Sequence, residues 1–279
     1  MRVYSPSQTK SYLESPMGWY LHYVEGWSPK YLGRKELSGY LGSAFAKGME
    51  SYHTGGGDAE SVLNAAMFEL QTNLEKSFLA GYSVLPKEEV FYGNLSDHLR
   101  RLVDKGMNNS PIPSDWIIVG SEVVIPECGN CRLDLLVSTP VGITFVDYKS
   151  KVTLESGYLK DKVINEWSQD WQFYHYAWAL KESQGVNVSE YHVALVIATG
   201  GVKPVLHTYP VDPELLLVWY DCARQTWTDM EECELGLRKP VWDFKLNNQY
   251  GPNPWNEAII NNHFHESLMS RNYVQRKRK

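Results

Sequence analysis

Two short apolar runs on either side of a turn, between residues 131 and 151, constrain the fold of this chain more than any other stretch. The turn residues 139–142 read Thr-Pro-Val-Gly, and apolar runs around such a turn predict a β-hairpin. Charged side chains are rare in strands and are seldom buried without a partner. Two carboxylates and a lysine are nevertheless set close to these apolar runs: Asp134, Asp147 and Lys149.

Side-chain alternation along the strands places these charges together. Residues i and i+2 point to the same face, so Asp147 and Lys149 project to one side and Tyr148 to the other. If Asp134 lies opposite on the partner strand, two carboxylates and one ammonium converge. Neighbouring carboxylates repel each other unless a proton or a cation lies between them, and a divalent ion is the usual solution. The alternative is a surface hairpin with a lateral Asp147–Lys149 ion pair.

An ion and a lysine in this arrangement can act on a phosphate ester. A divalent ion lowers the pKa of water, and an ammonium group offsets the charge that develops on a phosphodiester. The hairpin therefore indicates a hydrolytic site.

The chain before the hairpin is predicted to be mostly helical. Ser5 and Ser15, each followed by proline, have the pattern of helix starts. Three longer helices are expected over 39–52, from Asp58 to about Ala80, and within 87–109. Aromatic residues after the second start have a helical spacing that favours core packing, with base stacking as the alternative: Trp19, Tyr20, Tyr23 and Trp27.

The apolar period changes to two over 117–125, which predicts a strand with Glu122 on its polar face. The hairpin strands 131–138 and 143–150 and a later apolar run, 191–199, would join it in a sheet of four or more strands. The expected apolar face of the first strand consists of Ile117, Val119, Val123 and Ile125.

A helix at about 162–182 is expected between the third and fourth strands. Such a crossover implies that these two strands pair in parallel. Gln172 and Tyr176 lie four residues apart, hence on one surface of this helix, where they can overhang the acidic cluster. The nearby His175 is interpreted as structural. The side chains expected to pack on the sheet are Ile164, Trp167, Trp171, Tyr174 and Trp178.

Composition narrows the class of protein. With 279 residues, 43% of them hydrophobic and 22% charged, the chain suits one globular domain, 1–279. We expect a helical N-terminal part, 1–115, a core, 116–210, and a C-terminal part of helices and loops, 211–279. Apolar runs too short to span a bilayer, the lack of a signal peptide and few cysteines predict a cytoplasmic protein without a membrane partner.

The cysteines and the net charge leave alternatives open. Cys128 and Cys131 have the spacing of a zinc knuckle, but Cys222 and Cys233 do not, so reduced thiols are expected rather than zinc. A net charge of -6 argues against nonspecific coating of nucleic acid, but not against a nucleic-acid enzyme. The basic tail 276–279 is interpreted as a solvated terminus, with a DNA contact as the alternative.

The order of these motifs resembles the PD-(D/E)XK nuclease superfamily, and within it the RecB-like exonuclease branch that includes CRISPR-associated exonucleases. The resemblance covers about residues 5–200. It implies an α/β fold with a restriction-endonuclease-like core, a mixed central sheet flanked by helices, and a helical N-terminal half. The matching positions are Asp134, Asp147-Tyr148-Lys149, Gln172 with Tyr176, and the opening serine-led helix.

The resemblance also implies roles for these residues. Asp134 and Asp147 would bind a divalent metal, Mg²⁺ or Mn²⁺, with the Tyr148 carbonyl as a further ligand. Lys149 would position or polarise the attacking water. The pair on the helix, Gln172 and Tyr176, would contact substrate or hold the geometry of the site.

This sequence departs from the family pattern near the metal. The family's Gly-x-x-x-His motif matches residues 42–46, so the metal-binding histidine is Ala46 here. Glu50, one turn on, would reach the metal instead, or the site would have fewer protein ligands. Glu122 lies where some members have an additional acidic group.

Further departures concern cysteine and glycine positions. Ser15 replaces the family's cysteine before proline, and residues 242–262 contain no cysteine, so an iron–sulfur cluster is not expected. The glycine usually found three residues before the hairpin aspartate is Cys131.

The resemblance implies a metal-dependent DNA nuclease, and more specifically an exonuclease of recombination, repair or phage replication. DNA would be the substrate, and a helicase or recombination protein would be a possible partner. If the protein is phage-encoded, it would act in the host cytoplasm. Two alternatives stay open: a catalytically impaired subunit for DNA binding or assembly, which Ala46 would favour, and a hydrolase of another phosphate ester.

Overall fold

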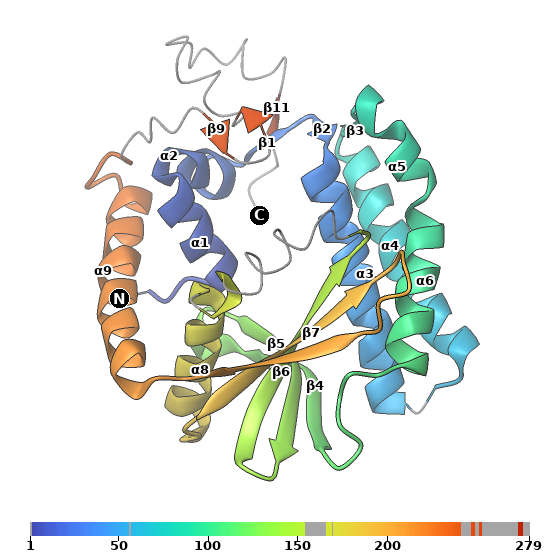
Figure 1. Cartoon of the computed structure of the whole chain (residues 1–279). Helices are drawn as coiled ribbons and strands as arrows, with labels where there is room; N and C mark the ends of the chain where they lie inside the picture. Colours follow the sequence, from blue (N-terminus) through green and yellow to red (C-terminus); the bar gives the residue numbers. More distant parts are fainter. Residues whose placement is uncertain are drawn as a thin grey trace.

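The segments with alternating apolar residues form a five-stranded mixed sheet in the order β4-β5-β6-β7-β8 (Figure 1). The pair β6 and β7 is parallel, and the other neighbours are antiparallel. The parallel pairing expected from the crossover is therefore confirmed. The strands are β4 Ile117–Ile125, β5 Cys131–Thr139, β6 Gly142–Lys151, β7 Glu190–Ile197 and β8 Val205–Pro210.

The computed structural model describes residues 2–55, 57–153, 166–168 and 170–240 and three short segments, 247–248, 251–252 and 273–275. The remaining strands are short and form two-stranded pairs: β1 Trp27–Pro29 with β11 Tyr273–Gln275, β2 Tyr31–Leu32 with β3 Ser83–Val84, and β9 Asn247–Asn248 with β10 Gly251–Pro252. The basic tail 276–279 and most of 242–262 lie outside the described residues.

Helices cover both faces of the sheet (Figure 1). One face carries α3 Arg34–Gly55, α4 Ala59–Leu79, α5 Glu89–Gly93 and α6 Leu95–Asn108. The other face carries α1 Pro6–Glu14, α2 Pro16–Trp19, α8 Trp171–Gln184 and α9 Pro213–Glu234. Each set of helices buries its own apolar core against the sheet, so alternate side chains of a central strand enter different cores. A mixed α/β sheet flanked by helices is the expected fold class.

The helix starts at Ser5, Ser15 and Asp58 are confirmed, whereas the helix expected over 39–52 is longer, α3 Arg34–Gly55. The side chains of Ser5, Ser15 and Asp58 each accept a hydrogen bond from a backbone N–H of the first turn, which satisfies a donor that the helix leaves free. The aromatic stripe after Ser15 is only partly core, because Trp19 is fully buried whereas Tyr23 is 41% exposed.

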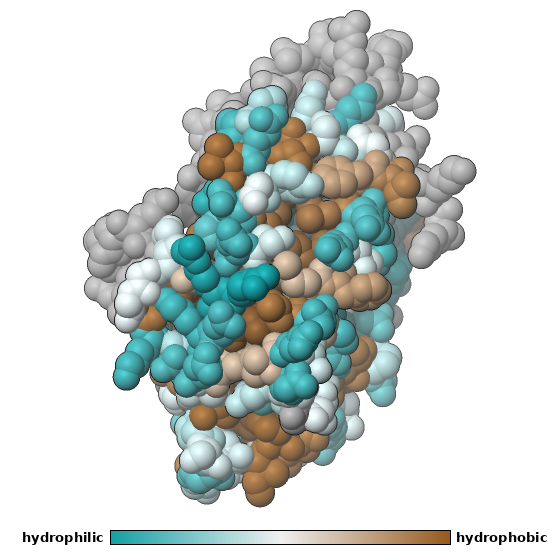
Figure 2. All heavy atoms as spheres, turned by 90° about the vertical axis from the view of Figure 1, so that its right-hand side faces the viewer, coloured by the Kyte–Doolittle hydropathy of each residue, from teal (hydrophilic) through white to brown (hydrophobic). Residues whose placement is uncertain are grey.

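The prediction that the first strand buries its apolar residues is wrong for the first two of them. Ile117 and Val119 are 67% and 53% exposed, because β4 is an edge strand and a bulge between Ile118 and Gly120 shifts its register. Val123 and Ile125 do pack on the core, as expected. Hydrophobic side chains gather at the lower end of the molecule in Figure 2, the end at which Figure 1 places the β5–β6 turn.

The expected crossover helix is interrupted, because residues 166 and 167 are helical but residues 168 and 170 are not. Asp170 has an extended backbone and caps α8, which starts at Trp171. The side chains of Trp167, Tyr174 and Trp178 are buried in the core, as predicted, and Ile164 lies outside the described residues. His175 is a core residue whose Nε2 lies 3.0 Å from the carbonyl oxygen of Cys128.

The cysteines do not gather into one site. Cys128, Cys131 and Cys233 are buried in the core beside α8 and α9, and Cys222 is exposed. Along the described parts of the chain, no helix combines the length and apolarity needed to cross a lipid bilayer.

Candidate active site

The candidate site forms where β5 and β6 separate. Paired residues run from Thr139 and Gly142 to Leu135 and Val146, and beyond Val146 strand β6 pairs with β7 instead. Asp134 and Asp147 are the next residues to face each other. The Asp134 carboxylate replaces the missing ladder partner, because its Oδ2 accepts a hydrogen bond of 2.7 Å from the backbone N–H of Tyr148. The structure thus brings both carboxylates to the point of separation.

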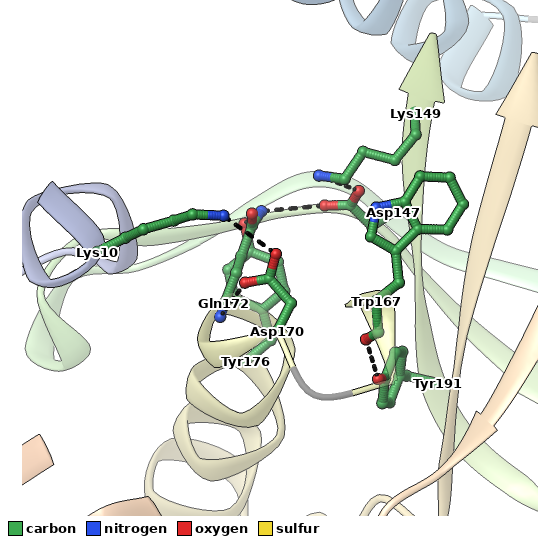
Figure 3. A network of polar contacts seen from close by, with 8 residues as sticks. All are labelled: Lys10, Asp147, Lys149, Trp167, Asp170, Gln172, Tyr176 and Tyr191. Carbon is green, nitrogen blue, oxygen red and sulfur yellow. Dashed lines mark hydrogen bonds and ion pairs between the residues drawn. The ribbon is translucent and has the colours of Figure 1, made fainter. Parts of the chain in front are cut away.

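Figure 3 shows Asp147 between Lys149 and Gln172, in contact with both. It is only 2% exposed, and its Oδ2 lies 2.7 Å from Lys149 Nζ. Its Oδ1 accepts a hydrogen bond of 3.1 Å from Gln172 Nε2, which also donates to the Tyr176 hydroxyl at 2.6 Å. The polar flank of α8 therefore contacts the acidic cluster directly, as its position after the crossover led us to expect.

Burial disfavours the ionised forms of the two carboxylates, and only one ammonium group lies beside them. Burial and the charge of Asp147 raise the pKa of Asp134 to about 8, although Lys149 partly offsets them. Burial also raises the pKa of Asp147. The pKa of Lys149 is raised too: burial alone would lower it, but the nearby carboxylates outweigh burial. One ammonium group faces two carboxylates, so a further cation would stabilise their ionised forms.

Comparison with known proteins identifies the family of this chain. The model of the PD-(D/E)XK nuclease superfamily matches residues 3–229. The chain belongs to the PD-(D/E)XK nuclease superfamily. It is also similar in structure to a protein of Eubacterium rectale named "Putative exonuclease", with 12% identity, a TM-score of 0.49, and coverage of 86% of this chain and 84% of that one. No curated protein matches the chain.

The oxygen donors of this nuclease-superfamily site fit a hard divalent cation. Mg²⁺ is commonly held by one or two carboxylates together with water and substrate phosphate, so Asp134 and Asp147 suffice as acidic ligands. Their raised pKa values support the fit, since a cation between them would offset the burial that raises both values and the charge of Asp147 that further raises that of Asp134. Tyr148, whose carbonyl is the further ligand expected from the resemblance, lies between Asp147 and Lys149 and donates its N–H to Asp134.

Two further acidic residues stay apart from this pair. Glu122, at a positive φ of 52° in bulged β4, has its Oε2 2.8 Å from Arg132 Nε, although its charge still raises the pKa of Asp134. Glu50 on α3 forms an ion pair with Lys47. Within the described ranges, no three His, Cys, Asp or Glu side chains form a group that could hold a metal ion.

Sequence reasoning missed Asp170 and Lys10. Asp170 Oδ1 accepts a hydrogen bond of 3.0 Å from the Gln172 N–H, and its Oδ2 lies 3.2 Å from Lys10 Nζ on α1 (Figure 3). Its charge also raises the pKa of Asp147 and of Lys149. The signal was an aspartate before a helix, which went unnoticed because the helix expected over about 162–182 ran across Asp170 without a break.

His53 was missed as well. It lies on α3, behind the sheet, and its Nε2 is 2.8 Å from the Tyr148 hydroxyl, while the two rings stack. Burial lowers the pKa of His53 to about 4, so its imidazole is neutral at physiological pH. This contact fixes the middle residue of the Asp147-Tyr148-Lys149 segment from the opposite face.

Proposed function

We propose that this protein is a divalent-metal-dependent deoxyribonuclease that degrades DNA from its ends. The observation that carries the proposal is the convergence of Asp134, Asp147 and Lys149 where β5 and β6 part, in a chain of the PD-(D/E)XK nuclease superfamily. The resemblance to the RecB-like branch favours an exonuclease of recombination, repair or phage replication. It also favours residues 1–279 acting as one domain.

Asp134, Asp147 and the Tyr148 carbonyl would hold Mg²⁺ or Mn²⁺. When bound, such an ion activates water for attack and offsets negative charge on the phosphate. These carboxylates are held in place by donors of the protein, Tyr148 N–H for Asp134 and Gln172 Nε2 for Asp147. A site fixed in this way needs little reorganisation when the substrate arrives.

Lys149 would supply a fixed positive charge beside the reacting phosphate. Its Nζ lies 2.7 Å from Asp147 Oδ2 and 5.4 Å from the centre of the Phe173 ring, so the side chain is held from two sides. Its raised pKa keeps it protonated at neutral pH. An ammonium group in a low-dielectric site stabilises the charge that develops on the phosphate oxygens.

Gln172 and Tyr176 would be positioning residues. The Gln172 amide lies between Asp147 Oδ1 and the Tyr176 hydroxyl, so it orients the carboxylate. The resemblance left two roles open for this pair, contact with the substrate or maintenance of the site's geometry. The hydrogen bonds support the second role.

The test is degradation of labelled DNA. We expect the wild type to shorten linear duplex or single strands with Mg²⁺ or Mn²⁺, to leave a covalently closed circle intact, and to be inactive with EDTA. Lys149→Ala should lower the rate by about 100-fold or more, since removal of one group that stabilises transition-state charge costs about 10²–10³. Lys181→Ala, an exposed lysine on α8, is the matched control and should retain full activity.

The alternative is a nuclease fold that binds DNA without cleaving it. The separation of Glu50 and Glu122 from the Asp134–Asp147 pair and the alanine at position 46 favour this reading. DNA binding without cleavage in either metal ion would support it and contradict the nuclease proposal. Cleavage of a closed circle would instead refute the exonuclease assignment alone.

A further inference from the structure

A cavity of about 320 Å³ lies beyond the carboxyl ends of the parallel strands β6 and β7. Val152 and Thr153 follow β6 there, and Thr199 follows β7. The two strand ends are joined, because the backbone N–H and the hydroxyl of Thr199 donate to the Val152 carbonyl at 3.0 and 2.6 Å. Ligands of α/β proteins commonly bind at this end of parallel strands.

Arg34 gives this cavity a fixed cation. Its guanidinium carbon lies 3.3 Å from the centre of the Phe91 ring, and its Nη1 lies 3.7 Å from Glu88 Oε2. The His98 ring packs against Phe91, at 5.6 Å between ring centres. The Arg34 side chain is still 53% exposed. The guanidinium is therefore held in place and remains open to a ligand.

Other lining groups favour an anion. The exposed side chain of Lys87 supplies a further donor, whereas the Asn94 amide already donates to the Val90 carbonyl oxygen at 2.7 Å. His98 Nδ1 is buried and forms no hydrogen bond within the described part of the chain. Burial lowers the pKa of His98, and the charges of Arg101 and Arg34 lower it further, although Asp97 acts in the opposite direction. Arg34 and Lys87 together exceed the single negative charge of Glu88.

The cavity lies close to the candidate active site along β6. Val152 follows Lys149 by three residues, which is about 10 Å at about 3.3 Å per residue. Successive phosphates of one DNA strand are farther apart through space than their rise of about 3.4 Å along the helix axis, so this distance corresponds to fewer than three nucleotides.

We propose that this cavity binds a backbone phosphate of the DNA strand whose scissile phosphate lies at Asp147 and Lys149. Arg34 supplies the main contact, held by Phe91 and Glu88, and Lys87 adds a second cation. The inference rests on the proposed nuclease function. It assigns to α3, α5 and α6 a part in substrate binding that the catalytic cluster does not supply.

The experiment compares Arg34→Gln and Lys87→Gln with Lys35→Gln, a neighbouring exposed lysine that does not line the cavity. Affinity for a labelled single-stranded oligonucleotide is measured by fluorescence anisotropy in EDTA over a range of salt concentrations. Arg34→Gln should weaken binding about tenfold, as expected for one charge-assisted hydrogen bond. It should also reduce the slope of log Kd against log salt by about 0.7. Lys87→Gln should act in the same direction, and Lys35→Gln should match the wild type.

Kinetics with Mg²⁺ separate this inference from the proposed function. Arg34→Gln should raise KM for an oligonucleotide about tenfold but leave hydrolysis of bis(4-nitrophenyl) phosphate unchanged, because that substrate is too small to reach the cavity. If the wild type cleaves DNA while Arg34→Gln and Lys87→Gln keep its affinity and salt slope, the subsite is refuted and the nuclease stands. If the wild type neither binds nor cleaves DNA, the proposed function fails first.

Two further measurements keep the test decisive. Inorganic phosphate that competes with the oligonucleotide at equal concentration would indicate a site for free phosphate and overturn the strand assignment. Melting temperatures of the variants show whether Arg34→Gln folds, and Lys87→Gln decides the question if it does not, because the Lys87 side chain is exposed.

Discussion

Replacing Asp134 by asparagine should stabilise the metal-free protein at neutral pH. Burial and the charge of Asp147 raise the pKa of Asp134 from 3.8 to about 8. The unfolded chain therefore ionises this carboxyl freely between these values, whereas the folded chain resists ionisation. The stability contributed by the protonated carboxyl is complete below about pH 4 and is lost as pH rises through 8. Asparagine stays neutral and keeps an oxygen that can accept from Tyr148 N–H.

The size of the effect follows from the shift. Each unit of pKa corresponds to about 1.4 kcal/mol, so a rise of about four units sets an upper limit of about 6 kcal/mol above pH 8. Asp134 is only half-buried, and solvent screening reduces the penalty. We expect a gain of about 2 kcal/mol at pH 7.5, or about 4–8 °C in Tm.

Thermal unfolding followed by circular dichroism, with EDTA at pH 4 to 9, measures this gain. The difference in Tm between Asp134→Asn and the wild type should be near zero at pH 4 and largest near pH 8. Added Mg²⁺ should raise the Tm of the wild type more than that of the variant, because the ion needs the carboxylate. Asp104→Asn, an exposed aspartate on α6, serves as control. An Asp134→Asn protein that is no more stable than the wild type at pH 8 would refute the reasoning.

Two other substitutions test how the site and its scaffold are held. Tyr148→Phe leaves the buried His53 without its 2.8 Å partner, so we expect a loss of about 1–2 kcal/mol in urea unfolding and a several-fold lower nuclease rate, whereas an unchanged rate would show that the contact is only structural. Gly129→Ala should cost about 2 kcal/mol or more in the same assay, because φ is +73° and a Cβ would lie 2.5 Å from the Tyr4 carbonyl oxygen. Gly39→Ala, in helix α3 with nothing within 4 Å of a Cβ, should instead stabilise by about 0.5–1 kcal/mol, and a loss at this position would contradict the helix argument.

Local chemistry made much of the fold predictable. Ser5 and Asp58 mark helix starts because their side-chain oxygens can accept a hydrogen bond from a free N–H of the first helical turn. The shared face of Asp147 and Lys149 follows from the period of a strand, and the parallel pairing of β6 with β7 follows from the crossover between them. These features depend on residues close together in the chain.

Features that depend on distant residues could not be read from the sequence. The exposure of Ile117 results from its place at the sheet edge, which no local pattern reveals. His53 and Tyr148 meet across 95 positions and on the far side of the sheet. The Arg34 cavity combines residues from three helices, α3, α5 and α6, and two strand ends. Only tertiary packing determines such neighbours.

Strand β6 connects the antiparallel part of the sheet with its parallel part. Through Val146 it belongs to an antiparallel hairpin, and from there on it belongs to a parallel pair. Asp134 on β5 and Asp147 on β6 both lie directly beyond the last antiparallel pair, Leu135 and Val146, so a substitution that changes the twist of the sheet is expected to change the spacing of the two carboxylates. If the two carboxylates hold a cation as proposed, substitutions in the sheet that are remote from the site would change its affinity through the backbone.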